Sequence, residues 1–197
     1  SAIKTLVEKG YLRSQKVKFI RRPYKQLKRE NKQINLTEAQ RNAIESINST
    51  DKTTTLIFGV TGSGKTEIYL ELIDKVIKEG KSAIMLVPEI SLTPQMLSQL
   101  QNRFKENAAI LHSGLSAGER FDEWWRIRNG QAKIVIGARS AIFAPVENLG
   151  LIVIDEEHDG SYTSESSPRY QTIDVATYRA KINGAKLVLG SATPAIE

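Results

Sequence analysis

Continuous apolar runs alternate with amphipathic helical segments from residue 35 onward, and this alternation limits the fold more than any other feature. The runs lie at residues 53–59, 82–88, 108–112, 133–138, 150–156 and 186–192. Most hold Val, Ile and Leu at consecutive positions, as do strands of a parallel sheet that is buried on both faces. Parallel strands joined by helices need right-handed crossovers. The pattern therefore predicts an α/β domain over residues 35–197, with a mostly parallel sheet and helices on both faces.

Start signals mark several of the intervening helices. Thr37 with Gln40, and Ser116 with Glu119, have the spacing of a capping box. Thr93 precedes Pro94, and proline is well suited to the first position of a helix. These signals predict helices that begin near residues 38, 94 and 117.

The composition and the cysteine count exclude several classes of protein. Among the 197 residues there is no Cys, which excludes disulfides and cysteine-ligated metal sites within this chain. No apolar run approaches the roughly 18 residues that a membrane-spanning helix needs. The composition, with 40% apolar and 25% charged residues, is that of an ordinary globular protein. We therefore expect no membrane association and a cytoplasmic location.

The first 34 residues differ from the rest in charge. Residues 1–35 hold 11 Lys and Arg against two Glu, a net charge of +9, while residues 36–197 carry a net charge of −3, so the basic character of the chain belongs to this segment. It reads as a short helix that ends near Gly10, followed by a basic arm and a polar connector. Both a solvated linker and a phosphate-binding arm fit this charge, and the residues alone leave the two open.

The stretch "GVTGSGKT" follows the first apolar run and precedes a good helix former, so it is a tight turn, a linker or a cradle for phosphate. It matches G-x-x-x-x-G-K-[ST] with a strand before it and a helix after it, which favours the cradle. The loop's backbone N–H groups and the helix N-terminus would bind phosphates, Lys65 would reach the outer phosphates and the Thr66 hydroxyl would bind Mg²⁺. The predicted nucleotide-binding residues of this loop are Gly59, Thr61, Gly62, Ser63, Gly64, Lys65 and Thr66.

An acidic pair follows the fifth apolar run, in "LIVIDEEHDG". Asp155 would lie at the carboxyl end of its strand, where a parallel sheet binds its ligands. With a phosphate cradle present, we expect Asp155 to bind Mg²⁺ and Glu156 to orient and deprotonate the attacking water. The predicted catalytic residues are thus Lys65, Asp155 and Glu156, with ATP and Mg²⁺ as cofactors.

Asp155-Glu156-Glu157-His158 resembles the D-E-x-H signature of superfamily 2 helicases, and further stretches agree in order and spacing. "LTEAQ", "VPEISLTPQM", "LHSGLSAGER", "GARSAIFAP", "DEEHDGSY" and "GSATPAIE" together resemble one family within it, the primosomal protein N′ family of bacterial replication-restart DNA helicases. The resemblance covers essentially all of residues 36–197 and implies the first RecA-like motor lobe. Residues 1–34 are similar to the end of that family's winged-helix domain and its linker.

The resemblance also implies roles that the residues alone do not. Gln40 would read the adenine, while His158, Ser191 and Thr193 would link hydrolysis to DNA movement. The segment 158–170 reads by composition as a surface loop with two locally packed tyrosines, but it is similar to the family's aromatic-rich loop that joins DNA contact to hydrolysis. The expected DNA-binding residues are Pro88, Ser91, Arg139, Ser140, Tyr162, Arg169 and Tyr170. Ala138 departs from the threonine that the resemblance leads us to expect, so Arg139 and backbone N–H groups would bind the phosphate there.

Two further groups, the aromatic residues near position 124 and the two methionines, are expected to have packing roles. Trp124 and Trp125, with Phe121 and Ile127, are expected on a core or half-buried helix face. Met85 and Met96 are expected in the core.

The resemblance implies an ATP-dependent DNA helicase that unwinds 3′→5′ and restarts stalled forks in the bacterial cytoplasm. Its partners would be forked or single-stranded DNA, primosome proteins and single-strand binding protein, with zinc only in parts of the family beyond the segment matched here. By itself the chain is expected to be nearly inactive, because an arginine from a second lobe normally completes such a site. Two alternatives stay open, another superfamily 2 DNA or RNA translocase and a nucleotide-gated DNA-binding module without turnover.

Overall fold

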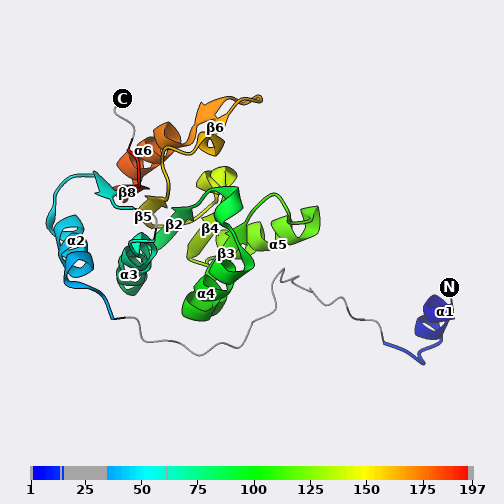
Figure 1. Cartoon of the computed structure of the whole chain (residues 1–197). Coiled ribbons are helices and arrows are strands. Elements are labelled where there is room, and N and C mark those ends of the chain that lie inside the picture. Colours follow the sequence, from blue (N-terminus) through cyan, green and yellow to red (C-terminus); the bar gives the residue numbers. More distant parts are fainter. Residues whose placement is uncertain (1, 14, 16–34, 61, 195–197) are drawn as a thin grey trace.

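The computed structural model describes residues 2–13, 15, 35–60 and 62–194, and a six-stranded parallel sheet forms the centre of the domain (Figure 1). The strand order is β1-β8-β5-β2-β4-β3, and every neighbouring pair is parallel. The strands are β1 (Thr54–Phe58), β2 (Ser82–Leu86), β3 (Ala108–Leu111), β4 (Ile134–Gly137), β5 (Leu149–Ile154) and β8 (Lys186–Ser191). Each predicted apolar run contains one of them, which confirms the predicted α/β fold.

Helices cover both faces of this sheet. On one face α2 (Glu38–Ser49), α3 (Lys65–Lys78) and α4 (Pro94–Phe104) share a core with the strands. On the other face lie α5 (Ala117–Arg128), α6 (Thr172–Asn183) and the 3-10 helix η3 (Arg139–Phe143). Three further 3-10 turns are η1 (Glu89–Ser91), η2 (Lys105–Asn107) and η4 (Gly160–Tyr162).

The predicted helix starts are confirmed. Thr37 and Ser116 each begin their helix with a complete capping box, in which the cap side chain and the N3 side chain bond each other's backbone N–H. The Thr93 side chain caps α4, whose first residue is Pro94. These local bonds explain why the helices begin where the sequence predicted.

The alternation of side chains along the strands explains why consecutive apolar residues were needed. In β2, Ala83 and Met85 belong to the core under α3, whereas Ile84 and Leu86 belong to the core under α6, and all four are fully buried. Successive side chains of a strand point to opposite faces, so a sheet covered on both sides requires an apolar residue at every position. Met85 is in the core as expected, and Met96 packs partly buried against it.

Because all six strands run parallel, their carboxyl ends meet at one edge of the sheet. The loop 59–64 leaves β1 there, Asp155 follows β5, and β8 ends at Ser191. The same edge receives Pro88 after β2 and Arg139 after β4. Residues far apart in the sequence are thereby brought to one edge, the usual ligand-binding side of an open parallel sheet.

Two parts of the chain lie outside this sheet. The segment expected as a loop at 158–170 contains η4 and an antiparallel hairpin, β6 (Thr163–Ser164) with β7 (Tyr170–Gln171), which projects from the domain (Figure 1). Near the N-terminus α1 (Ala2–Glu8) is followed by Gly10 at a φ of +75°, so the predicted short helix is confirmed. Residues 16–34 lie outside the described part, and the assignment of residues 1–34 to a winged-helix domain stays a prediction. No helix among the described residues has the length and apolar character to cross a membrane.

Candidate functional site

The glycine-rich loop between β1 and α3 has the backbone geometry of a phosphate cradle. Gly62 and Gly64 have φ values of +81° and +83°, in the left-handed region that side chains other than glycine rarely adopt. At Gly64 an added Cβ would lie 2.3 Å from Nε2 of Gln40, and at Gly59 it would lie 2.9 Å from Oγ of Ser63. The glycines are thus needed for both conformation and space. Thr61 lies outside the described residues.

Lys65 is the first residue of α3 and its side chain is almost buried, with 7% exposed. Its Nζ donates to the carbonyl oxygens of Gly59, at 2.6 Å, and Val60, at 3.5 Å. It also lies 3.5 Å from Oε1 of Glu156. The predicted lysine and the predicted base therefore meet across the loop.

Gln40 contacts the cradle rather than an open surface. Its Nε2 donates to the Gly64 carbonyl at 3.2 Å, while its Oε1 accepts from the backbone N–H of Thr37 at 2.8 Å. The capping box thus fixes the amide group against the loop. Its expected role in reading adenine stays a prediction.

The acidic pair follows β5 directly. Asp155 donates its backbone N–H to Leu86 of β2, and Glu156 has a φ of +48°, which is uncommon for a residue with a side chain. A cleft of about 490 Å³ contains Lys65, Thr66, Asp155 and Glu156 in its walls. Burial raises the pKa of the Asp155 carboxyl above its usual value, and the hydrogen bond from Tyr69 opposes that rise.

Two residues that the sequence did not single out support Asp155. Tyr69 of α3 is fully buried, and its hydroxyl donates to Oδ1 of Asp155 at 3.0 Å. Gly190 of β8 leaves room for that hydroxyl, because a Cβ there would lie 1.7 Å from the Tyr69 oxygen and 3.2 Å from Asp155 Oδ1. From the sequence, Tyr69 is one more residue on the apolar face of a helix. Its contact with Asp155 arises only because α3 packs against β5 and β8.

We expect Gly190→Ala to destabilise the domain by about 1–3 kcal/mol, because the added methyl overlaps the hydroxyl of the fully buried Tyr69. Urea unfolding measures the loss. Tyr69→Phe is the matched control, since it removes the atom that the methyl meets first. The double variant should therefore lose less stability than the sum of the two single variants. A Gly190→Ala protein as stable as its parent would contradict this packing.

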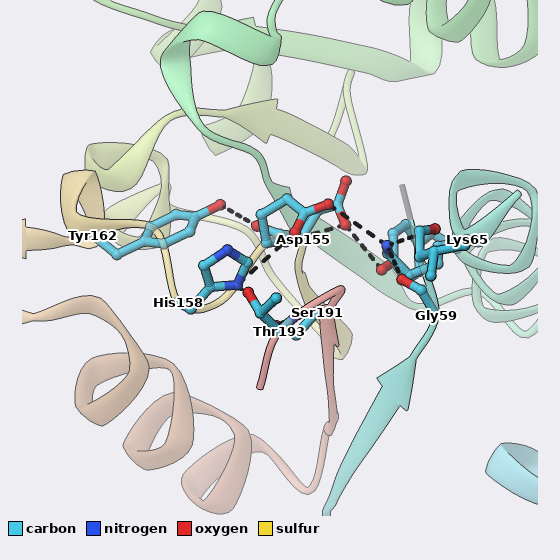
Figure 2. A network of polar contacts seen from close by, with 10 residues as sticks. Gly59, Lys65, Asp155, His158, Tyr162, Ser191 and Thr193 are labelled. Carbon is cyan, nitrogen blue, oxygen red and sulfur yellow. Dashed lines mark hydrogen bonds and ion pairs between the residues drawn. The ribbon is translucent and has the colours of Figure 1, made fainter. Parts of the chain in front are cut away.

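His158, Ser191 and Thr193, the three expected coupling residues, form one hydrogen-bonded group (Figure 2). Nδ1 of His158 lies 2.8 Å from Oγ of the fully buried Ser191, which also accepts from the Thr193 backbone N–H at 3.2 Å. The Ser191 carbonyl accepts from the Gly59 backbone N–H at 3.1 Å. The end of β8 is thereby bonded to the start of the cradle and to His158.

Tyr162 does not lie where a DNA-stacking residue should. Its side chain is 3% exposed, and its hydroxyl donates to the Asp155 backbone carbonyl at 2.8 Å (Figure 2). Burial strongly raises the pKa of its hydroxyl, which keeps it protonated as a donor. The expectation that Tyr162 stacks on a base is wrong, because its side chain is buried in the core beneath α6.

Arg139 connects the adjoining hairpin to the domain. Its Nη1 donates to the carbonyl oxygens of Ser161, at 3.2 Å, and Thr163, on either side of Tyr162. Its guanidinium also lies 5.8 Å from the centre of the Tyr170 ring. Arg139, Ser140 and Tyr170 border one pocket, whereas Arg169 is exposed on the hairpin, where its Nε donates to the Glu165 carbonyl.

Two other residues expected to bind DNA lie elsewhere. Pro88 is buried, so its ring is not available at the surface. Ser91 lies in the wall of the cleft with Lys65 and Glu156 instead of beside Arg139. The chain turns back toward α3 through η1 after β2, which sequence spacing does not reveal. Ala138 and Arg139 both border the pocket beyond β4.

The parallel sheet, the glycine cradle and the adjoining Lys65, Asp155 and Glu156 define a P-loop nucleotide-binding domain. The family model described as "DEAD/DEAH box helicase" matches residues 37–197. The chain therefore belongs to the DEAD/DEAH box helicase family.

Individual relatives indicate which members of the family the chain resembles. The replication restart protein PriA of Bacillus subtilis is 50% identical over the whole chain, and that of Treponema pallidum is 50% identical over 82% of it. In each case the chain spans 25% of the relative's length. Among solved structures, RecG bound to a three-way DNA junction has a TM-score of 0.61 at 26% identity, covering 82% of this chain and 21% of that one. The helicase domain of Pyrococcus furiosus Hef, with a TM-score of 0.58 at 22% identity over 81% of this chain and 33% of that one, shows the same fold.

Proposed function

We propose that this chain is the ATP-binding motor lobe of a DNA helicase that restarts stalled replication forks, with ATP hydrolysis driving 3′→5′ unwinding. The observation that carries the proposal is the convergence of Lys65, Asp155 and Glu156 on one cleft at the carboxyl edge of the sheet. The 50% identity to replication restart proteins supports the biological role. Forked or single-stranded DNA, primosome proteins and single-strand binding protein would be its partners, in the cytoplasm of a bacterium.

Each residue of the cleft has a distinct role in the proposed ATP hydrolysis. Backbone N–H groups at the start of α3 and the Lys65 ammonium bind the phosphates of ATP. The Thr66 hydroxyl and the Asp155 carboxylate are oxygen ligands of the type that Mg²⁺ prefers, and both border the cleft. When bound, Mg²⁺ neutralises charge on the phosphates. The tyrosine hydroxyl on Asp155 Oδ1 orients this carboxylate and leaves its second oxygen for the metal.

The Glu156 carboxylate is paired with the Lys65 ammonium. Phosphate binding draws the ammonium toward the nucleotide, which frees the Glu156 carboxylate to accept a proton from the attacking water. The lysine's other present partners are two backbone carbonyls of the same loop, so it can change partners without breaking the fold.

A chain of contacts offers a route from bound DNA to this chemistry. Arg139 contacts the two carbonyls that flank Tyr162, and the hydroxyl of Tyr162 contacts the carbonyl of Asp155. The Arg139 guanidinium also interacts electrostatically with Glu89 and borders the open pocket beyond β4, where it is available to a DNA phosphate. DNA that shifts Arg139 would thus move the backbone next to Glu156. The His158–Ser191 pair provides a second connection, toward the end of β8.

In the full-length helicase we expect forked DNA to stimulate ATP hydrolysis at least about tenfold, and a structured RNA of equal length to stimulate it far less. Both follow from the proposed coupling, because hydrolysis depends on DNA that fits the surface beside Arg139. Steady-state phosphate release with each nucleic acid, together with strand separation of a labelled fork, makes the measurement. Equal stimulation by RNA would favour another superfamily 2 translocase, and hydrolysis indifferent to both would refute the motor assignment.

A second function is favoured for the chain by itself. Lys65 is the only cationic side chain among the described residues that border the cleft, which also contains Glu67, Asp155 and Glu156. Such a site can bind Mg²⁺-ATP but lacks a second cation for the charge that develops during phosphoryl transfer. Without further parts the chain would act as a nucleotide-gated DNA-binding module. DNA affinity measured with and without a non-hydrolysable ATP analogue tests this.

A further inference from the structure

A second pocket, separate from the nucleotide cleft, lies between α5, η3 and the hairpin. Its volume is about 580 Å³, large enough for a single nucleotide unit. Trp124 and Arg120 come from α5, Phe143 and Arg139 from η3, and Tyr170 from β7. Five side chains with aromatic or cationic groups thus come together from three elements that are distant in the sequence.

The aromatic side chains of this pocket are not core residues. Trp124 is 45% exposed and Phe143 is 54% exposed. The Phe143 and Tyr170 rings meet edge to face, with centroids 5.1 Å apart and an interplanar angle of 79°, which fixes the orientation of both. The expected core or half-buried face of α5 is confirmed for Ile127, which is buried, and for Trp125, which is half-buried. Trp124 keeps 45% of its surface exposed, and the expectation is wrong for Phe121, which is 59% exposed. Large exposed aromatics around a hollow indicate a binding surface.

The charges of the pocket suit a ligand with an anionic and a hydrogen-donating part. Arg120 is exposed and its guanidinium has no partner among the described residues, while Arg139 lies in the opposite wall. Glu89 is the carboxylate of the pocket, and hydrogen bonds from the Ser113 side chain and backbone lower its pKa, which keeps it ionised. Flat rings, two guanidinium groups and one acceptor together complement a nucleobase with an adjoining phosphate.

We propose that this pocket binds one unstacked base of single-stranded DNA, with the Trp124 ring as the stacking surface and Arg120 contacting a neighbouring phosphate. This inference rests on the proposed DNA helicase function and adds to it a site for one particular nucleotide. Arg139 borders this pocket and also belongs to the route to Asp155. A base bound in the pocket would therefore contact the arginine that holds the hairpin.

The experiment pairs protein variants with altered DNA in the full-length helicase. Trp124→Ala should weaken binding of a short oligothymidylate by about 5- to 150-fold, the usual effect of losing one stacked base. Phe121→Ala is the matched control, because Phe121 is 59% exposed on the same helix, one turn away, and does not border the pocket. It should bind like the parent. Trp124→Phe, which keeps a ring, should recover most of the affinity.

An abasic site moved stepwise along the oligonucleotide identifies the bound base. At one position it should weaken binding to the parent protein as much as Trp124→Ala does, and at that position it should cost the Trp124→Ala variant nothing further. Arg120→Gln should lower the slope of log affinity against log salt by about 0.7, the effect of one lost phosphate contact on a single strand. Circular dichroism establishes that each variant is folded.

Two results separate failure of this inference from failure of the proposed function. If Trp124→Ala and Phe121→Ala bind DNA equally and no abasic position matters, while forked DNA still stimulates hydrolysis, the pocket serves another ligand, such as a protein side chain, and the inference is wrong. If the parent shows no DNA-stimulated hydrolysis but the abasic pattern appears as described, the motor assignment fails and the base pocket remains.

Discussion

Glu156→Gln is expected to lower DNA-stimulated ATP hydrolysis by about 10²–10⁴-fold, the range for losing a general base. The amide keeps the size of the side chain but cannot accept the proton of the attacking water. Its position close to Lys65, at 3.5 Å, and in the wall of the nucleotide cleft is where such a base is needed. Nucleotide binding should persist or strengthen, because Lys65 loses a competing carboxylate.

The measurement is single-turnover hydrolysis alongside binding of a fluorescent ATP analogue, both in the full-length helicase. Glu157→Gln is the matched control, since it makes the same chemical change one residue further along, outside the residues that border the cleft. That variant should hydrolyse ATP close to the parent rate. If Glu156→Gln retained parental hydrolysis, Glu156 would not be the base and the acidic pair would have a different role.

The chain by itself is expected to hydrolyse ATP about 10³–10⁵-fold more slowly than a protein of the relatives' length, even with saturating DNA. The physical reason is the charge of the cleft, where Lys65 is the one cation among the described residues that border it and faces Asp155 and Glu156, while Glu67 is paired with Arg103 outside the cleft. Phosphoryl transfer moves negative charge onto the leaving oxygen, and a second cation normally stabilises it. The relatives are four times longer than the part matched here, which leaves ample sequence for one.

Phosphate release measured on the chain and on the full-length helicase under identical conditions tests this. Nucleotide affinity is the control, because a folded chain should still bind Mg²⁺-ATP through its cradle. Turnover by the chain within tenfold of the full-length rate would show that its own residues complete the site, and the nucleotide-gated module would be excluded.

Local patterns predicted a large part of the molecule. Capping boxes specify helix starts through bonds between residues three apart, so Thr37 and Ser116 could be read directly. The six apolar runs could be read as buried parallel strands because both faces of the sheet are covered. The cradle and the acidic pair lie within short stretches whose backbone geometry follows from glycine and from the end of a strand. Their position at one edge then follows from parallel pairing.

Those local patterns could not predict contacts between segments that are distant in the sequence. Tyr162 and Tyr69 are both tyrosines on or near apolar segments, yet one donates to the carbonyl of Asp155 and the other to its carboxylate. Trp124 and Ile127 lie on one helix, and only the angle at which α5 packs on the sheet decides which of the two is exposed. Pro88 and Ser91 follow the same strand, but the turn η1 buries the first and directs the second to the nucleotide cleft.

The sequence by itself thus determined the fold class, the phosphate cradle and the acidic pair, because each depends on neighbours within one strand, turn or helix. Only the tertiary structure decided which side chains support Asp155, which aromatics reach solvent and why position 190 must be glycine. Those outcomes depend on distances between α3, β5, β8 and α5, which are set by how the layers pack and not by spacing along the chain.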